Sequence, residues 1–265
     1  AKYTISSKEV ERAAEAIAVG QSIGNPDKRA KYETEKMWKE YGAKVTDIQF
    51  TDDKNAIVTI NYPNRIFTPG SLTHLLTVLM GGQMDIDLIE KCILTELRFE
   101  EEIVSSYAGP KFGVKKVRES VKVSERSMIG GIIKPKTGLD EDTLKKIVEE
   151  MIDGGIDFIK EDEILGEIRG INFLDRIKFI DKLIEKKKSN VIYAPALNVS
   201  MGQLDNAIKE LNRMEHIKAF HFNVWGGLDL FKYISDNTTK MSFYQKSGDK
   251  VITSGKFSIS FEIWC

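Results

Sequence analysis

The sequence predicts an α/β protein of two domains, a compact α+β domain over residues 1–110 and a domain of repeated strand–helix units over residues 111–265. Segments of the first part follow the order β-α-β-β-α-β, which favours an antiparallel sheet with helices on one face. Residues 107–113 contain the glycines and the proline of a linker. Beyond Arg126, apolar strands alternate with helices, which indicates a parallel sheet.

The composition favours a globular protein with a small-molecule partner. The 265 residues are 42% hydrophobic, enough for a sizeable core in one or two domains. A formal net charge of −1 gives no electrostatic footprint for nucleic acid or an anionic membrane, and no apolar run is long enough to span a bilayer. Cys92 and Cys265 lack partners at metal-ligand spacing, so we expect a reducing compartment, the cytoplasm. The start at Ala1 and the apolar end predict a sequence cut from a longer protein.

The N-terminal domain is predicted from alternating strands and from helix-capping residues. Ser7 is expected to cap a first helix that continues through an alanine-rich run to Ala18. Pro69-Gly70-Ser71 is expected to cap a second helix, which Gly81-Gly82-Gln83 ends after Met80. The expected strands are residues 3–5, 44–50, 55–62 and 93–99.

The second domain repeats a strand followed by a helix. The expected strands are residues 128–133, 157–160, 191–197, 216–222 and 241–244, and the helices begin near Asp140 and cover residues 174–187, 203–214 and 228–234. Periodicity alone does not separate an open doubly wound sheet from a (β/α)8 barrel. In both, chemistry takes place at the carboxyl ends of the strands. The polar residues expected there are Lys134, Lys136, residues 160–163, Asn198, His221 and Asn223.

The stretch 154–163 ends a buried strand in one lysine and three acids. Alternate side chains of a strand point to opposite faces, so the charged groups separate unless the chain turns. A turn would bring Lys160, Asp162 and Glu163 together, and converging oxygens form a site for a hard cation such as Mg²⁺. The alternative is a solvated, mixed-charge loop. Lys134-Pro135-Lys136, at a strand end one strand–helix unit earlier, favours the metal site.

Several phrases of the sequence resemble one enzyme family. The most specific are IIKPKTGL and GGIDFIKEDE, and GSLTHLLTVLMGG, ELRFEEEIVSSYAGPKFGV and ALNVSMG stand in the same family's order. They are similar to the ribulose bisphosphate carboxylase (RuBisCO) large-chain superfamily, most of all to RuBisCO-like proteins of form IV. The resemblance implies a ferredoxin-like α+β domain and then a (β/α)8 TIM barrel, of which this chain holds about the first five units. It also implies a homodimer or larger homo-oligomer, with active sites shared between two subunits.

The resemblance also implies a cofactor. Lys160 matches the lysine that CO₂ converts to a carbamate, and Asp162 and Glu163 match the carboxylates that complete the Mg²⁺ site. The chemistry agrees, because a neutral buried amine can attack CO₂ and the product is an anionic oxygen ligand that Mg²⁺ favours. Such a metal would polarise a substrate carbonyl and stabilise an enediolate intermediate.

Three further residues take their expected roles from this resemblance, and His221 is a fourth candidate because of its position at a strand end. Lys134 matches the lysine that acts beside the enolate as acid or base, and Lys136 is its neighbour on the substrate side. His221 is a candidate for substrate binding, although a histidine after a buried strand is more often structural. Glu161 stands where carboxylases usually have aspartate and is not expected to bind the metal.

The chain departs from the carboxylases at other positions. Residues 241–246 replace the His-x-His-Arg run of the fifth barrel strand and contain no histidine. Gly82 stands at the asparagine that a partner subunit contributes, and Gly20 and Asn25 lie near a glutamate and a threonine of the first domain. The loop lysine after the sixth strand would follow Cys265.

These features give three hypotheses. The first is a RuBisCO-like, Mg²⁺-dependent enolase or isomerase that acts on a phosphorylated, sugar-like ketone, with Lys160 and Lys134 as catalytic residues. The second is a ribulose-1,5-bisphosphate carboxylase, which fixes CO₂. The third is a catalytically silent scaffold or binding protein that keeps the fold.

Overall fold

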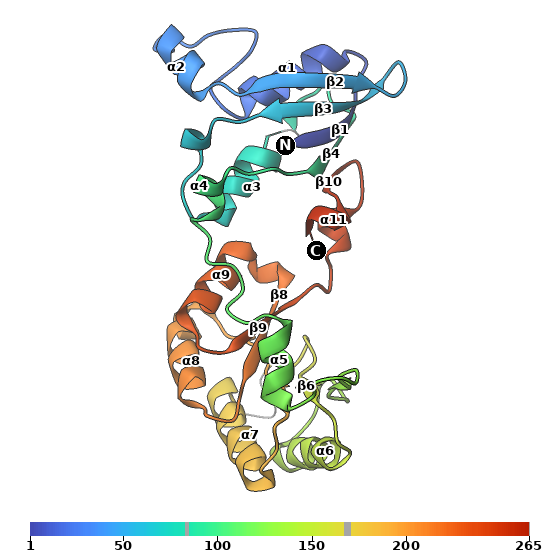
Figure 1. Cartoon of the computed structure of the whole chain (residues 1–265), viewed down its shortest axis with the longest axis vertical. Helices are drawn as coiled ribbons and strands as arrows, with labels where there is room; N and C mark the ends of the chain where they lie inside the picture. The colour runs from blue at the N-terminus through green and yellow to red at the C-terminus, as the bar shows by residue number, and fades with distance from the viewer. Residues whose placement is uncertain (83–84, 167–170, 265) are drawn as a thin grey trace. The chain divides into compact units, whose positions relative to one another are not determined.

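A computed structural model describes residues 1–82, 85–166 and 171–264. The predictions made for Gln83 and Cys265 lie outside these residues. The chain forms two compact units, one made of Ala1–Tyr107 together with Gly248–Cys265, the other of Ala108–Ser247 (Figure 1). Within the described ranges, no helix is both long enough and apolar enough to cross a bilayer.

The first unit is built on a five-stranded sheet. Its strands are β1 (Lys2–Ser6), β2 (Lys44–Phe50), β3 (Asn55–Asn61), β4 (Lys91–Glu96) and β10 (Phe257–Ile259). The order is β10-β4-β1-β3-β2, and β1 lies antiparallel between β3 and β4, with Thr4 opposite Ile57 and Ile93. The four N-terminal strands and the helices between them confirm the predicted α+β domain.

One face of this sheet is buried under two helices. Tyr3 and Ile5 of β1 alternate with half-exposed neighbours and pack in one core with helix α1 (Val10–Gly20) and helix α3 (Leu72–Met80). Ser71 caps α3 as predicted, because its Oγ accepts a hydrogen bond from the His74 backbone at 3.1 Å. Among the described residues of the unit, further helices are α2 (Glu35–Tyr41), η1 (Asn64–Ile66), α4 (Glu101–Val104), α10 (Lys250–Thr253) and α11 (Phe261–Trp264).

Two expectations for this unit were wrong. Ser7 does not cap α1, whose N-cap is Glu9; the Ser7 Oγ instead accepts from the Glu9 backbone at 3.0 Å. The barrel domain was expected to reach residue 265, but Gly248–Cys265 packs with the first unit. The reason is edge pairing, because β10 lies parallel to β4 with Phe257 opposite Cys92 and Ile259 opposite Leu94 (Figure 1).

The second unit is a run of five parallel strands. They are β5 (Gly130–Ile132), β6 (Phe158–Lys160), β7 (Ile192–Ala194), β8 (Ala219–Asn223) and β9 (Met241–Gln245). Pairing follows chain order, β5 to β6 to β7 and β8 to β9, and an Ala196–His221 bridge joins the two groups. Neighbours in strict chain order are typical of a barrel and not of a doubly wound sheet, whose order reverses. The partial (β/α)8 barrel is therefore confirmed.

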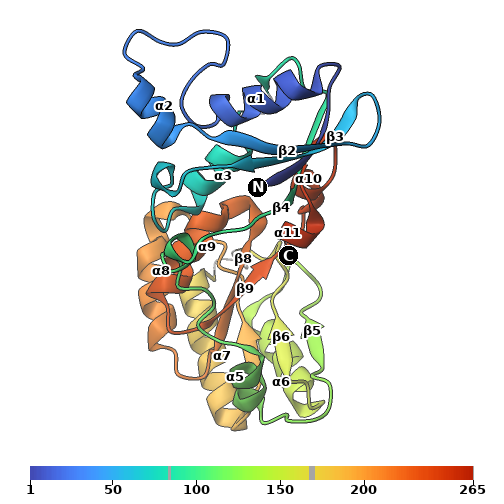
Figure 2. The same cartoon turned by 45° about the horizontal axis from the view of Figure 1, so that its top comes forward.

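Helices cover these strands and share their core. They are α5 (Val114–Val121), α6 (Glu141–Asp153), α7 (Phe173–Lys187), α8 (Met201–Arg213), η3 (Val224–Gly226) and α9 (Leu228–Asn237). Helix α7 lies beside both α6 and α8 (Figure 2). Asp140 caps α6 by accepting from the Thr143 backbone at 2.9 Å, and Gly155 follows this helix with a φ of +79°. Only glycine adopts that angle without strain, so the turn into β6 depends on Gly155.

Candidate active site

The register of the barrel strands brings two charged side chains together. Ile132 of β5 lies beside Lys160 of β6 in the parallel ladder. Lys134 and Asp162 each follow these partners by two residues, and the Lys134 Nζ donates to the Asp162 Oδ2 at 2.5 Å. The Lys134 side chain is 54% exposed, whereas that of Asp162 is 3% exposed. The buried Asp162 carboxylate is thus paired with Lys134, whose side chain is partly exposed to solvent.

The chain turns directly after β6 and returns Glu163 to Lys160. The Lys160 Nζ donates to the Glu163 Oε2 at 2.9 Å. The turn is fixed at Asp162, whose Oδ1 accepts from the Ile164 backbone at 3.1 Å and whose carbonyl accepts from Leu165 at 3.0 Å. Lys160, Asp162 and Glu163 therefore lie together at one strand end, in the arrangement that a turn was expected to produce.

The two carboxylates are ionised at neutral pH. Burial opposes the charge on Asp162, but the hydrogen bonds from Lys134 and the Ile164 backbone, together with the positive charge of Lys134, outweigh it. The pKa of Asp162 therefore lies below its usual value. Burial likewise opposes the charge on Glu163, but donors that include Lys160 and Ser247 lower its pKa to about 2. Both groups can therefore serve as anionic ligands.

The donor set fits Mg²⁺ once Lys160 carries CO₂. In the structure the ammonium groups of Lys134 and Lys160 neutralise Asp162 and Glu163. Within the described residues, no three His, Cys, Asp or Glu side chains form a metal-binding group, so unmodified side chains alone do not complete a site. A carbamate would turn Lys160 from a donor into an anionic acceptor and leave an excess of negative charge beside Glu163. A divalent cation would neutralise that excess.

His221 lies beneath this cluster and not on its surface. Its side chain on β8 is fully buried, which argues against direct contact with a substrate and favours the structural role. Neither ring nitrogen is hydrogen-bonded within the described part of the chain. Burial first, and then the charge of Lys160, lowers the pKa of His221 to about 3. The imidazole is therefore neutral at physiological pH.

The buried His221 should make the metal-free protein lose stability on acidification. The unfolded chain takes up a proton near the ordinary value of 6.5 and the folded chain only near 3, so the stabilisation is complete above pH 6.5 and is lost as the pH falls toward 3. Between pH 6.5 and 5 we expect a loss of about 2 kcal/mol from this residue. Urea unfolding of native protein and of His221→Gln measures it.

The comparison of native protein with the variant isolates the contribution of this residue. His221→Gln should flatten the dependence on pH between pH 6.5 and 5. An unchanged pH dependence in His221→Gln would show that the acid loss comes from other groups.

Two asparagines order the backbone of the turn. The Asn198 Nδ2 donates to the carbonyls of Glu163 at 2.9 Å and Leu165 at 2.8 Å. Asn223 donates in turn to the Asn198 Oδ1 at 3.1 Å. Lys136, by contrast, is an exposed residue of the loop after β5, and the structure does not bring it to the acids. Its expected contact with a substrate stays a prediction.

The sequence alone did not single out two parts of the site. The Ser247 Oγ donates to the Glu163 Oε1 at 2.9 Å, and the strand-end rule applied after β9 could have found it. Arg176 is buried behind the turn and bonds to Glu161. The sequence feature that could have identified Arg176 is its position among Phe173, Ile177 and Ile180 on the apolar face of α7.

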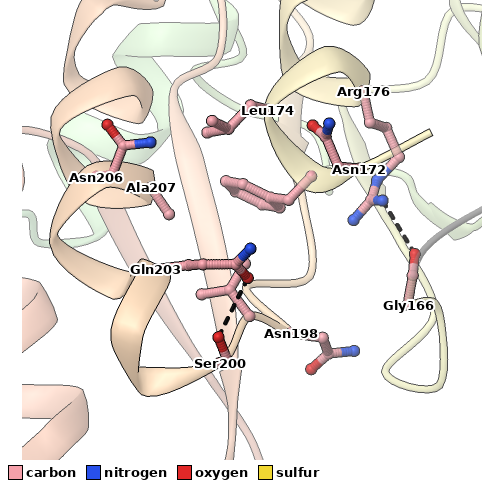
Figure 3. Close-up of a pocket in the computed structure, with 11 residues that line it drawn as sticks. Gly166, Asn172, Leu174, Arg176, Asn198, Ser200, Gln203, Asn206 and Ala207 are labelled. Carbon is pink, nitrogen blue, oxygen red and sulfur yellow. Dashed lines mark hydrogen bonds between the residues drawn. The ribbon is translucent and has the colours of Figure 1, made fainter. Parts of the chain in front are cut away.

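Two cavities adjoin the turn. One, of about 610 Å³, has Glu163 and Ser247 in its wall and is otherwise lined mainly by apolar side chains of loops and helices after β7 and β8. The other, of about 410 Å³, lies between the starts of α7 and α8 and is lined by both amide and apolar side chains (Figure 3). Only the first contains one of the predicted metal ligands in its wall.

Comparisons with known proteins identify the family of the chain. The model for the ribulose bisphosphate carboxylase large chain, N-terminal domain, matches residues 3–103, and that for the catalytic domain matches residues 113–242. A ribulose bisphosphate carboxylase of Archaeoglobus fulgidus is 30% identical over 235 residues, covering 86% of this chain and 52% of the relative. A 2,3-diketo-5-methylthiopentyl-1-phosphate enolase of Bacillus licheniformis is 32% identical over 194 residues, covering 70% and 47%.

A solved structure shows the same fold. Octameric ribulose-1,5-bisphosphate carboxylase/oxygenase from Pyrococcus horikoshii superimposes with a TM-score of 0.87 at 21% identity, covering 97% of this chain and 62% of that one. The chain spans about half the length of the curated relatives it matches.

Proposed function

Because the chain belongs to the ribulose bisphosphate carboxylase large-chain family, whose members are carboxylases or enolases, we propose that it is a Mg²⁺-dependent enolase or isomerase. Its substrate would be a phosphorylated, sugar-like ketone. The observation that carries this proposal is the meeting of Lys134 with Asp162, and of Lys160 with Glu163, at the carboxyl ends of β5 and β6. Barrel enzymes place their chemistry at that end of the strands.

Each residue of the cluster has a chemical task in this proposal. Lys160, as a carbamate, would hold Mg²⁺ together with Asp162 and Glu163. When bound, Mg²⁺ supplies a Lewis acid that polarises a carbonyl oxygen. Lys134 carries the proton, because its ammonium is half-exposed and already lies 2.5 Å from the Asp162 carboxylate. Loss of Asp162 as a partner would free that amine to act on a substrate.

The cavity beside Glu163 offers room for a small molecule. Its volume of about 610 Å³ falls within the range of ligand pockets. Lys136 extends from the loop after β5, where an exposed ammonium suits a phosphate group. These two features support a small phosphorylated substrate.

Strand β9 favours enolisation over carboxylation. Its residues Met241–Gln245 contain no histidine, where the resemblance to carboxylases calls for a His-x-His-Arg run. A curated relative of similar identity is an enolase. Carboxylation stays the second candidate, because the Archaeoglobus relative is a carboxylase.

Hydrogen exchange in deuterated water tests the proposal. The protein, with Mg²⁺ and bicarbonate, should exchange the carbon-bound hydrogen next to the carbonyl of ribulose 1,5-bisphosphate or of 2,3-diketo-5-methylthiopentyl 1-phosphate. Incorporation of labelled CO₂ into acid-stable product would instead establish the carboxylase. If the protein catalyses neither reaction and also fails to bind Mg²⁺, the catalytically silent scaffold is the hypothesis that remains.

We also propose a homodimer or larger assembly acting in the cytoplasm, since the solved relative from Pyrococcus is an octamer. Light scattering at micromolar concentration should give at least twice the monomer mass of 30.0 kDa. A monomer at all concentrations would contradict this assembly.

A further inference from the structure

A buried carboxylate lies on the opposite side of the metal-site turn. Glu161 is fully buried, and its Oε1 accepts hydrogen bonds from the Arg176 Nε at 2.8 Å and the Tyr193 hydroxyl at 2.7 Å. Its Oε2 accepts from the Ala196 backbone at 2.8 Å. Donors from helix α7, from strand β7 and from the chain after β7 therefore converge on one side chain. Three such contacts offset the cost of burying the charge.

The donors are themselves held in place. The Arg176 side chain is 1% exposed, and its Nη1 also donates to the Gly166 carbonyl at 3.0 Å (Figure 3). Tyr193 is fully buried. Burial, and then the negative charge of Glu161, raises the pKa of Tyr193 well above its usual value, so its hydroxyl keeps the proton that it donates. The arrangement is buried, and Arg176 and Tyr193 each donate to Glu161.

Glu161 alternates with the residues that face the site. Lys160 precedes it and pairs with Glu163, while Asp162 follows it and pairs with Lys134. Side chains alternate along an extended chain, so an anchor on Glu161 fixes the backbone from which Lys160 and Asp162 project toward the other side. A displacement of Glu161 would therefore displace both Lys160 and Asp162.

We propose that Glu161 is a positioning residue that sets the affinity of the site for Mg²⁺ by holding residues 160–163 against Arg176, Tyr193 and the Ala196 backbone. This inference rests on the proposed function, because it presupposes a CO₂-dependent Mg²⁺ site at Lys160. It goes further by assigning a role to a residue that binds neither metal nor substrate. Residues behind metal ligands typically change metal affinity by about 10–100-fold when replaced.

The length of the side chain makes the proposal specific. An aspartate is shorter by one methylene, about 1.5 Å, so its carboxylate cannot reach Arg176, Tyr193 and the Ala196 backbone unless the turn moves. Glu161→Asp should therefore displace the ligands or lose contacts, although it keeps the charge and is the residue that carboxylases usually have there. Tyr193→Phe is the milder variant, because it removes one donor and leaves the ion pair intact.

The other end of the same strand offers a matched control. Asp157 precedes β6, is 6% exposed, and accepts from Arg126 at 2.6 and 2.8 Å and from the Ile129 backbone at 2.9 Å. It shares with Glu161 a buried carboxylate, an arginine partner and a backbone donor. It differs in lying at the amino end of β6, away from the candidate metal ligands.

Calorimetric titration with Mg²⁺, in bicarbonate and in CO₂-free buffer, tests the proposal on the whole chain. Each variant is titrated at the same interval below its own melting temperature, so that all are folded. Glu161→Asp should weaken the CO₂-dependent affinity by about 10–100-fold. Tyr193→Phe should weaken it in the same direction by a smaller factor. Asp157→Asn should lower the melting temperature and leave the affinity unchanged.

The outcomes separate this inference from the proposed function. Native protein that binds no Mg²⁺ in bicarbonate overturns the proposed function and the inference with it. If native protein binds Mg²⁺ and Glu161→Asp and Tyr193→Phe bind it with the same affinity, the inference is overturned but the proposed function is not. Equal weakening by Asp157→Asn would mean that any ion-paired carboxylate at an end of β6 has this effect, and it would also overturn the inference. If Glu161→Asp does not fold, Tyr193→Phe decides.

Discussion

Replacing Lys160 with alanine is expected to abolish CO₂-dependent binding of Mg²⁺. The side chain is 4% exposed and ends 2.9 Å from the Glu163 carboxylate, and no other described lysine bonds to this carboxylate. Without it the site lacks the anionic oxygen that a carbamate would add to Asp162 and Glu163. Affinity in bicarbonate should fall by more than about 100-fold, beyond the range typical of residues that only support ligands. Calorimetry with and without bicarbonate measures the loss.

Lys240 provides a matched control. Its side chain is also buried, it precedes β9, and it donates to the Met214 carbonyl. Like Lys160 it is a buried lysine, but it lies before β9 and away from the turn. Lys240→Ala should keep CO₂-dependent binding. Retention of that binding in Lys160→Ala would contradict the metal site itself.

The features that the sequence predicted correctly are those encoded by residues close together in the chain. Asp140 and Ser71 mark helix starts, because a short polar side chain before an apolar run caps the free backbone groups. The barrel strands could be predicted because each is an apolar run of residues followed by polar or charged residues. Lys134 and Asp162 could be placed together because a parallel sheet collects strand ends at one edge.

The features that the sequence did not predict depend on pairing between residues that are far apart in the chain. Strand β10 has no local pattern that selects β4 as its neighbour, since any open edge with free backbone groups could accept it. The Glu161 anchor requires Arg176 from the next helix and Tyr193 from the next strand. Strand alternation placed Glu161 on the face opposite Lys160 and Asp162, but the sequence could not identify the partners that hold it there.

The Lys134 side chain should matter for turnover and not for metal binding. Lys134→Met is expected to slow hydrogen exchange at the substrate carbon by about 10²–10⁴-fold, the usual contribution of a general acid or base. It should leave Mg²⁺ binding intact or strengthen it, because the Lys134 ammonium now holds the Asp162 oxygen that a cation would use. Nuclear magnetic resonance in deuterated water follows the exchange, and calorimetry follows the metal.

Lys136 gives the contrast that separates proton transfer from substrate binding. The two lysines flank Pro135 on one loop, but only Lys134 reaches the acids. If Lys136 holds a phosphate, Lys136→Met raises KM and leaves kcat nearly unchanged, whereas Lys134→Met lowers kcat. Were Lys134→Met to change KM alone, its role would be binding, and the proton would have to move through another group at the strand ends. The split between the two constants therefore decides which lysine performs the chemistry.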